Sequence, residues 1–403
     1  MNEKIVTDVC IVGGGPAGLI CANLLASQGI RTLVLESHPD FAREYRGEVL
    51  MPRFIQAMKQ VSLFDYLLNF PHLKLQGFEL YLKKQPVATI GISEISPEVP
   101  FILWMPQPVM LNALYEKARQ NPNFTLWFDA RMTKLISNNG KISGIEAVKN
   151  RKPVEIEAKI TVGADGRFSK VRHEGGFELA YEDHDFDILW FTIPKPAGYD
   201  DNVRAFFSEK HNYLALPKYP DQIQCGILIA PGSYPRYKEE GIEALRKELL
   251  SAHPILKDFA ESLKDFSPFT LLAAKADRVK RWAKDGLVLI GDAAHTCSPA
   301  GAVGVSVATA TAIVASEVVA DAIKAGDYSQ KTLDRIQKLR QKDVEQIQAI
   351  QKRAATLIAT KNPLTKAFAF VILMLLAKTH IFARLQRRLM VASAPLPVRK
   401  VAV

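Results

Sequence analysis

The chain has 403 residues, of which 48% are hydrophobic and 23% charged, an ordinary balance for a soluble globular protein with two domains or one large composite fold. Its four cysteines form no Cys-x-x-Cys pair, which argues against a zinc site or a disulfide framework and favours a reducing cytoplasm. The net charge of +10 equals the ten cations that follow Glu345, and because no nucleic-acid-binding motif accompanies them, we expect no nucleic-acid partner.

An apolar, β-branched run at residues 4–12 predicts a buried first strand. It leads into Gly13-Gly14-Gly15-Pro16-Ala17-Gly18, a dinucleotide-binding fingerprint. In such a turn Gly13 permits the tight bend, Gly15 lets the backbone approach a pyrophosphate, and Gly18 lets the next helix pack on the sheet. That helix, Pro16–Ser27, is expected to present the free N–H groups of its N-terminus to the phosphates, so Pro16 and Ala17 join the predicted site.

A second predicted strand, Thr32–Leu35, ends at Glu36, which lies 18 positions after Gly18. An acid at this point can accept hydrogen bonds from the ribose hydroxyls of an adenosine. A glycine-rich turn without a ligand is the alternative, but the strand, the helix and the acid together favour a nucleotide site.

The remaining elements alternate between two domains. Helices are predicted at 52–68, 108–120 and 234–251, a β-meander at 124–162 contains the hairpin signal Asn139-Gly140, and a buried strand lies at 286–290. We expect a nucleotide-binding domain made of 1–75, 107–178 and 276–330, a substrate domain made of 76–106 and 179–275, and a basic helical C-terminal region at 331–403.

Two later motifs place an acid beside glycine after a predicted strand. They are Gly163-Ala164-Asp165-Gly166-Arg167 and Gly291-Asp292-Ala293-Ala294-His295. With the fingerprint, they resemble the single-component FAD-dependent monooxygenases typified by para-hydroxybenzoate hydroxylase, over residues 5–330, and are nearest to the ubiquinone-biosynthesis and antibiotic-tailoring hydroxylases. The resemblance implies an α/β fold, in which a Rossmann-type FAD-binding domain is interleaved with a mixed β-sheet substrate domain and followed by C-terminal helices.

The resemblance also implies cofactor-binding residues beyond the fingerprint. They are Glu36 at the adenosine ribose, Arg46 and Gln107 along the FAD chain, the backbone of Arg131 and Met132 at the adenine, Asp165 for both FAD and the visiting NADPH or NADH, and Asp292 at ribityl or pyrophosphate oxygens. No metal site is expected.

A loop of small residues follows the third motif and opens a helix that runs to about Lys324. The helix N-terminus can aim N–H groups at the N1–C2 region of the flavin, where negative charge develops on reduction. Close helix–sheet packing is the alternative reason for these small residues. The family usually has asparagine where Ser306 stands and often aspartate where Thr311 stands. The predicted contacts are Pro299, Gly301, Ala302, Val303 and Gly304.

The resemblance implies hydroxylation of an aromatic substrate, a phenol or quinol. If the C-terminal region binds a membrane, we expect that substrate to be lipophilic. NADPH or NADH reduces the flavin, O₂ adds at its C4a atom, and the hydroperoxide delivers oxygen to the ring. The cofactor carries the difficult chemistry, so no catalytic side chain is named. Two alternatives stay open: a flavin-dependent isoprenoid reductase of the geranylgeranyl type, and a non-catalytic FAD-binding protein.

The C-terminal region carries the excess positive charge. Residues 367–377 are uncharged but too few to span a bilayer, which needs about 20 apolar residues. Beyond them, one helical face is apolar and the other basic. This pattern predicts that residues 352–400 bind an anionic membrane surface, peripheral to its inner face, or that they form a core or dimer-interface helix with a solvated basic face. The apolar residues are Ile381, Phe382, Leu385 and Leu389, and the basic ones Arg384, Arg387 and Arg388.

Overall fold

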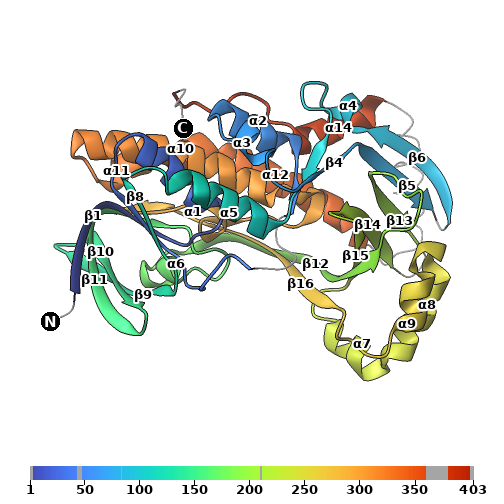
Figure 1. Cartoon of the computed structure of the whole chain (residues 1–403). Coiled ribbons are helices and arrows are strands. Elements are labelled where there is room, and N and C mark those ends of the chain that lie inside the picture. The colour runs from blue at the N-terminus through green and yellow to red at the C-terminus, as the bar shows by residue number, and fades with distance from the viewer. Residues whose placement is uncertain (1–2, 43–47, 83, 209–210, 360–379, 400–403) are drawn as a thin grey trace.

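The computed structural model describes residues 3–42, 48–82, 84–208, 211–359 and 380–399. Two large β-sheets occupy opposite ends of the molecule, and the long helices α10 (Gly304–Ala325) and α12 (Arg335–Ala359) run across the upper middle of the view in Figure 1. The chain passes between the two ends several times, and strands β12 and β16 lie side by side in the region that joins them. The expected α/β fold with two interleaved sheets and C-terminal helices is confirmed.

The first sheet has the strand order β17-β18-β11-β1-β2-β8, with β9 and β10 attached to β11 by antiparallel pairing. Its central strands β18, β11, β1 and β2 are parallel. Helices cover such a sheet, so its central strands are apolar and buried, as β2 shows along its whole length. The strands are β1 (Glu3–Val12), β2 (Thr32–Leu35), β8 (Phe124–Trp127), β9 (Ala130–Asn138), β10 (Lys141–Lys149), β11 (Lys152–Gly163), β17 (Ala283–Lys284) and β18 (Leu287–Leu289).

The second sheet has the order β19-β16-β12-β15-β14-β13-β5-β6 and is mostly antiparallel. Alternate side chains on its strands enter two different cores, one shared with the first sheet and one beneath α7, α8 and α9. A small sheet, β3-β7-β4, lies beside α2. The bounds are β5 (Gly77–Leu82), β6 (Gln85–Gly91), β12 (Leu179–Pro194), β13 (Asn202–Phe207), β14 (Asn212–Lys218), β15 (Gln222–Ile229), β16 (Thr270–Val279), β19 (His295–Thr296), β3 (Val49–Leu50), β4 (Leu73–Leu75) and β7 (Ile102–Trp104).

Two helices predicted as continuous are broken. The helix expected at 52–68 ends at Gln60 and restarts at Phe64, because Ser62 has a left-handed backbone with φ of 59°. The helix expected at 234–251 divides at Gly241, whose φ is 84°. The other helices are α1 (Pro16–Ser27), α2 (Pro52–Gln60), α3 (Phe64–Leu67), α4 (Ile92–Ile95), α5 (Gln107–Ala118), α6 (Lys170–Glu174), α7 (Tyr234–Glu240), α8 (Ile242–Ala252), α9 (Lys257–Ser262), α11 (Gln330–Leu333) and α14 (His380–Met390).

The described part of the C-terminal region packs on the body of the protein. Arg53 of α2, which is buried, donates to both carboxylate oxygens of Asp343 at 2.9 and 2.8 Å and to the carbonyl oxygens of Arg388 and Val391 at 3.3 and 3.2 Å. Leu389 is buried, whereas Leu385 and the three arginines of α14 are exposed. A packed helix with a solvated basic face therefore describes residues 383–390, and residues 360–379 lie outside the described residues.

One described stretch, Ala300–Ala325, has the length and the mean hydropathy, 1.8, of a membrane-spanning helix. However, 78% of its most apolar window is buried inside the protein, mainly in α10, which packs against α1, α2 and α12. We therefore describe α10 as the central core helix.

Candidate cofactor site

The three sequence motifs meet at one edge of the first sheet. Strands β1, β11 and β18 are adjacent and parallel, and their last residues are in register, Val12 beside Gly163 and Gly163 beside Leu289. Backbone hydrogen bonds continue past the strand ends, from Ala164 N to the Val12 oxygen at 2.8 Å and from Ile290 N to the Gly163 oxygen at 2.9 Å. The carboxyl ends of parallel strands are where α/β folds bind ligands, so the motifs occupy the expected edge.

The fingerprint glycines have different roles. Gly13 has φ of 112°, and a Cβ there would lie 2.4 Å from the Ala164 oxygen, while a Cβ at Gly18 would lie 2.0 Å from the Gly13 oxygen. These two glycines are required for packing within the protein. A Cβ at Gly15, in contrast, would meet no atom within 4 Å. Glycine at this position is explained by a ligand that approaches the backbone, which is the fit expected for a pyrophosphate.

The N-terminus of α1 is suited to an anion. Gly15 is the N-cap residue and provides no side chain to bind the first N–H groups, and Pro16, whose nitrogen carries no hydrogen, occupies the first helical position. Ala17 packs on the third motif, because a Cβ at Gly291 would lie 2.9 Å from the Ala17 Cβ. The helix therefore begins between two motifs, with free N–H donors and a partial positive charge.

Glu36 lies against the fingerprint. Its side chain is 2% exposed, and its Oε2 accepts from Gly14 N at 3.0 Å while Oε1 lies 2.6 Å from His38 Nδ1. The Glu36 carbonyl oxygen accepts from Ala130 N at 2.9 Å, which brings the start of β9 beside it. The next two residues are Arg131, exposed, and Met132, buried. The residues predicted for the adenosine thus come together around Glu36.

Asp165 is engaged by its own loop. Its Oδ1 accepts from Ser169 Oγ at 2.5 Å and its Oδ2 from Val171 N at 3.0 Å, and Ser169 in turn caps α6. Burial raises the pKa of this carboxyl group. The structure gives Asp165 the role of shaping the middle motif, and its direct contact with FAD or a nicotinamide remains a prediction.

Asp292 and Arg167 face each other across the second and third motifs. Arg167 Nε lies 3.4 Å from Asp292 Oδ2, and Arg167 Nη1 donates to the Ala273 oxygen at 3.1 Å. Both side chains are about one-third exposed, at 32% for Arg167 and 31% for Asp292. Desolvation raises the pKa of Asp292, although the neighbouring guanidinium opposes this effect. Asp292 is therefore accessible to a bound molecule and already held by a cation.

Residues 298–303, hereafter the 298–303 loop, connect the third motif to α10. Its middle residues Gly301 and Ala302 have φ of 74° and 50°, and Val303 is buried. At Gly304 the helix begins without a side-chain cap, so its first N–H groups are free to bind a ligand. In the first turn, Ser306 Oγ is buried and makes no hydrogen bond to the described residues. An unpaired buried hydroxyl at this point fits a polar group of a bound cofactor.

Two further predicted residues, Arg46 and Gln107, stay predictions. Arg46 lies outside the described residues. Gln107 is buried at the first position of α5, a helix that packs against α1.

Sequence reasoning missed two glutamines that hold the loop region. Gln348 and Gln351 of α12 are buried, and Gln351 Nε2 donates to the Ser298 and Ala300 oxygens, both at 2.7 Å. The signal was present in the sequence, because the apolar stripe of α12 is interrupted by polar residues at these positions. The buried positions of this stripe are Ile336, Arg340, Val344, Ile347, Gln348, Gln351 and Ala355.

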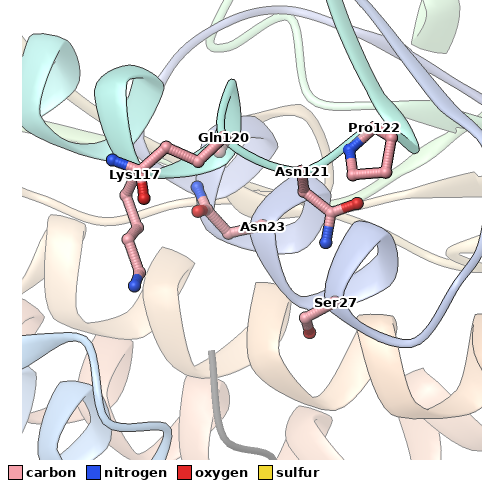
Figure 2. Close-up of a pocket in the computed structure, with 7 residues that line it drawn as sticks. Asn23, Ser27, Lys117, Gln120, Asn121 and Pro122 are labelled. Carbon is pink, nitrogen blue, oxygen red and sulfur yellow. The ribbon is translucent and has the colours of Figure 1, made fainter.

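A separate small pocket lies at the other end of α1 (Figure 2). Its volume is about 180 Å³, and it is lined by Asn23, Ser27, Lys117, Ala118, Gln120, Asn121 and Pro122. Ligand pockets usually have volumes of about 300–1,000 Å³. Ser27 is 11 residues from Pro16, roughly 16 Å along the helix. This pocket is thus too small for a dinucleotide and distant from the motifs.

Comparison with known proteins agrees with this geometry. The family model described as FAD binding domain matches residues 6–350. The 6-methylpretetramide 4-monooxygenase of Streptomyces rimosus is 29% identical over 395 residues, which are 98% of this chain and 94% of that protein. A digeranylgeranylglycerophospholipid reductase of Methanothrix thermoacetophila is 25% identical over 327 residues, which are 79% of each protein.

Among solved structures, p-nitrophenol 4-monooxygenase from Pseudomonas putida superimposes with a TM-score of 0.81 and 19% identity, covering 97% of this chain and 100% of that one. At this identity the similarity establishes the fold. The resemblance to flavin-dependent monooxygenases is thereby confirmed at the level of family and architecture. The chain belongs to the FAD-binding domain family.

Proposed function

We propose that this protein is an FAD-dependent monooxygenase that hydroxylates an aromatic substrate, with O₂ as co-substrate and NADPH or NADH as reductant. The observation that carries the proposal is the convergence of the three motifs at the carboxyl ends of β1, β11 and β18. The similarity to a Streptomyces monooxygenase along nearly the whole of both chains supports the reaction type.

Different residues of the site are proposed to bind different parts of FAD. The N-terminus of α1 would bind the pyrophosphate, Glu36 would accept from the hydroxyl groups of the adenosine ribose, and Asp292 would accept from the hydroxyl groups of the ribityl chain. When bound, FAD supplies a hydride acceptor and activates oxygen. The 298–303 loop and the N-terminus of α10 would present N–H groups to the flavin ring and would stabilise negative charge there.

The substrate is proposed to meet the face of the second sheet that shares a core with the first. Side chains on this face are mainly apolar: Ile188, Trp190, Leu214, Leu216 and Leu228. Gly226 leaves room for the Trp190 ring, since a Cβ there would lie 2.7 Å from Trp190 Cζ3. This lining suits an uncharged, lipophilic aromatic molecule better than a carboxylate-bearing one.

The direct test is anaerobic reduction. The purified, flavin-loaded protein is mixed with NADPH or NADH in the presence of a panel of phenols and quinol precursors, and the visible flavin absorption band is followed. We expect bleaching that one compound accelerates, followed by hydroxylated product when O₂ is admitted. A flavin that dithionite reduces but neither nicotinamide reduces, with any compound of the panel, contradicts the proposal.

A second function is kept because of the similarity to a digeranylgeranylglycerophospholipid reductase. Such an enzyme saturates double bonds and consumes no O₂, whereas a monooxygenase forms product only with O₂. Oxygen dependence of product formation therefore separates the two. A non-catalytic FAD-binding protein would hold flavin that no nicotinamide and no substrate affects.

We also propose a location in the cytoplasm, with residues 352–400 at the inner face of an anionic membrane. The exposed basic face of α14 and the exposed Leu385 beside it support the proposal. In flotation with anionic vesicles, glutamine at the three arginines of α14 should abolish binding. A control with glutamine at three exposed arginines elsewhere should retain it, and equal flotation of both variants contradicts the proposal. The control positions are Arg151, Arg236 and Arg281.

A further inference from the structure

Two glutamines on one face of α12 make matching contacts with different partners. Gln348 Nε2 donates to the Asp277 and Thr296 oxygens, both at 3.0 Å, and thereby fastens α12 to β16 and β19. Gln351, one turn later, uses its Nε2 in the same way but on the Ser298 and Ala300 oxygens. The first glutamine thus holds the sheet and the second holds the 298–303 loop.

The loop has one short backbone hydrogen bond of its own, from Ala302 N to the Pro299 oxygen at 2.9 Å, and Gln351 restrains it from outside. Gly301 and Ala302 have left-handed φ values, and Ala302 carries a side chain that makes this conformation unfavourable. Within the loop, Ser298 Oγ accepts from Ala300 N at a long 3.4 Å. The two bonds from Gln351 are both 2.7 Å long, one buried and one partly buried, and they are the shortest hydrogen bonds that the described loop makes.

A second contact supports the loop from outside. A Cβ at Gly301 would lie 2.4 Å from Leu389 Cδ2, so the Leu389 side chain of α14 rests directly on the Gly301 backbone. Leu389 is held in place because Arg53 binds the carbonyl oxygens of Arg388 and Val391 on either side of it. The loop therefore lies between α12, α14 and the cofactor site.

We propose that Gln351 is a positioning residue for the flavin: by fixing the Ser298 and Ala300 carbonyl groups, it sets the distance between the N–H groups at the start of α10 and the flavin ring. The inference rests on the proposed function, since it assumes that FAD occupies the motif-lined edge. Stabilisation of charge by preorganised donors depends steeply on their position, so a displaced loop weakens FAD binding and disfavours the reduced, negatively charged flavin.

The matched variants are Gln351→Met and Gln348→Met, which keep side-chain size and remove both donor bonds. Gln348 also accepts from Arg278 through its Oε1, so Gln348→Met removes more hydrogen bonds than Gln351→Met. If FAD affinity simply followed global stability, Gln348→Met would be the more damaging change. We expect instead that Gln351→Met weakens FAD binding more than Gln348→Met does, although it lowers the melting temperature by the same amount or less.

The measurements are the FAD dissociation constant of the apoprotein, the reduction potential of the bound flavin and the thermal unfolding of both variants. For Gln351→Met we expect at least tenfold weaker FAD binding and a more negative potential; for Gln348→Met, less than threefold weaker binding and an unchanged potential. Equal effects of the two variants on affinity and potential overturn the inference.

Two further outcomes are distinguishable. Wild-type apoprotein that does not bind FAD contradicts the proposed function itself, whereas a wild type that binds and a Gln351 variant that binds equally well contradict only the inference. If Gln351→Met does not fold, Gln351→Asn replaces it, because it keeps the amide but withdraws it by one methylene from the two carbonyl groups. Wild-type affinity and potential in Gln351→Asn overturn the inference in the same way.

Discussion

Gly15→Ala separates the requirements of the fold from those of the ligand. The backbone of Gly15 has φ of −78° and ψ of −176°, which alanine adopts without strain, and a Cβ there would meet no protein atom within 4 Å. The added methyl group therefore occupies only the space through which a pyrophosphate reaches the N-terminus of α1.

The expected magnitudes follow from this geometry. Loss of a favourable N-cap residue destabilises the helix, while alanine lowers the entropy of the unfolded chain, so the free energy of unfolding of the apoprotein should change by less than about 1 kcal/mol. Forcing one methyl group into a close-packed contact costs about 1–3 kcal/mol. We therefore expect the FAD dissociation constant to rise by about 5- to 150-fold.

The assay is titration of apoprotein with FAD, followed by flavin fluorescence, together with thermal unfolding without FAD. Gly18→Ala is the control, because its Cβ would lie 2.0 Å from the Gly13 oxygen and must displace α1 even when no ligand is present. It should lower the melting temperature of the apoprotein, which Gly15→Ala should not. Wild-type FAD affinity in Gly15→Ala, or a melting temperature as low as that of Gly18→Ala, refutes the reasoning.

Three further changes test other parts of the structure. Glu36→Gln removes the charge of the acceptor proposed for the ribose hydroxyl groups. Because hydrogen bonds to charged groups contribute about 1.5–3 kcal/mol, FAD should bind at least about tenfold more weakly in the same titration, and unchanged affinity places the adenosine elsewhere. Burial lowers the pKa of His295 to about 3. Below the ordinary histidine pKa of about 6.5, the unfolded chain therefore takes up a proton that the folded protein excludes. By about pH 5 the free energy of unfolding should have fallen by about 2 kcal/mol. Urea unfolding of His295→Gln should show a correspondingly smaller loss between neutral pH and about pH 5, and equal losses in the two proteins count against this account. Arg53→Leu removes one of the cations paired with Asp343 and frees the end of α14. The free energy of unfolding should fall by about 3–5 kcal/mol, measured by thermal unfolding, and residues 383–399 should become accessible to limited proteolysis. A variant as resistant to protease as the wild type contradicts this prediction.

The sequence predicted the first sheet well because its signals are local. A β-branched run, a glycine turn and a terminal acid define β1, α1 and Glu36 within 36 residues. The breaks at Ser62 and Gly241 were missed because periodicity continues across them, and only the backbone angle reveals the interruption.

The contacts made by α12 and the C-terminal segment could not be predicted in the same way. Gln351 and Ser298 are 53 positions apart, and Arg53 and Val391 are 338 apart. Such pairs depend on how whole elements pack, so a polar residue in an apolar stripe marks a buried contact without naming its partner. The apolar face of residues 381–389 indicated an amphipathic helix correctly, but its pattern is the same whether lipid or protein covers it.

Hydrogen bonds and ion pairs attach the C-terminal segment, residues 383–399, to the body of the protein along most of its length. Gln56 and Gln60 of α2 bind the backbone of Ala392 and Leu396, and Arg399 pairs with Glu317 and Asp321 on α10. Leu389 also packs on Gly301. A protein shortened before Leu389 therefore loses a contact that supports the 298–303 loop beside the proposed flavin site. Reduced activity in such a shortened protein would therefore reflect an altered redox centre, and lipid binding has to be examined by changing surface charges in the intact chain.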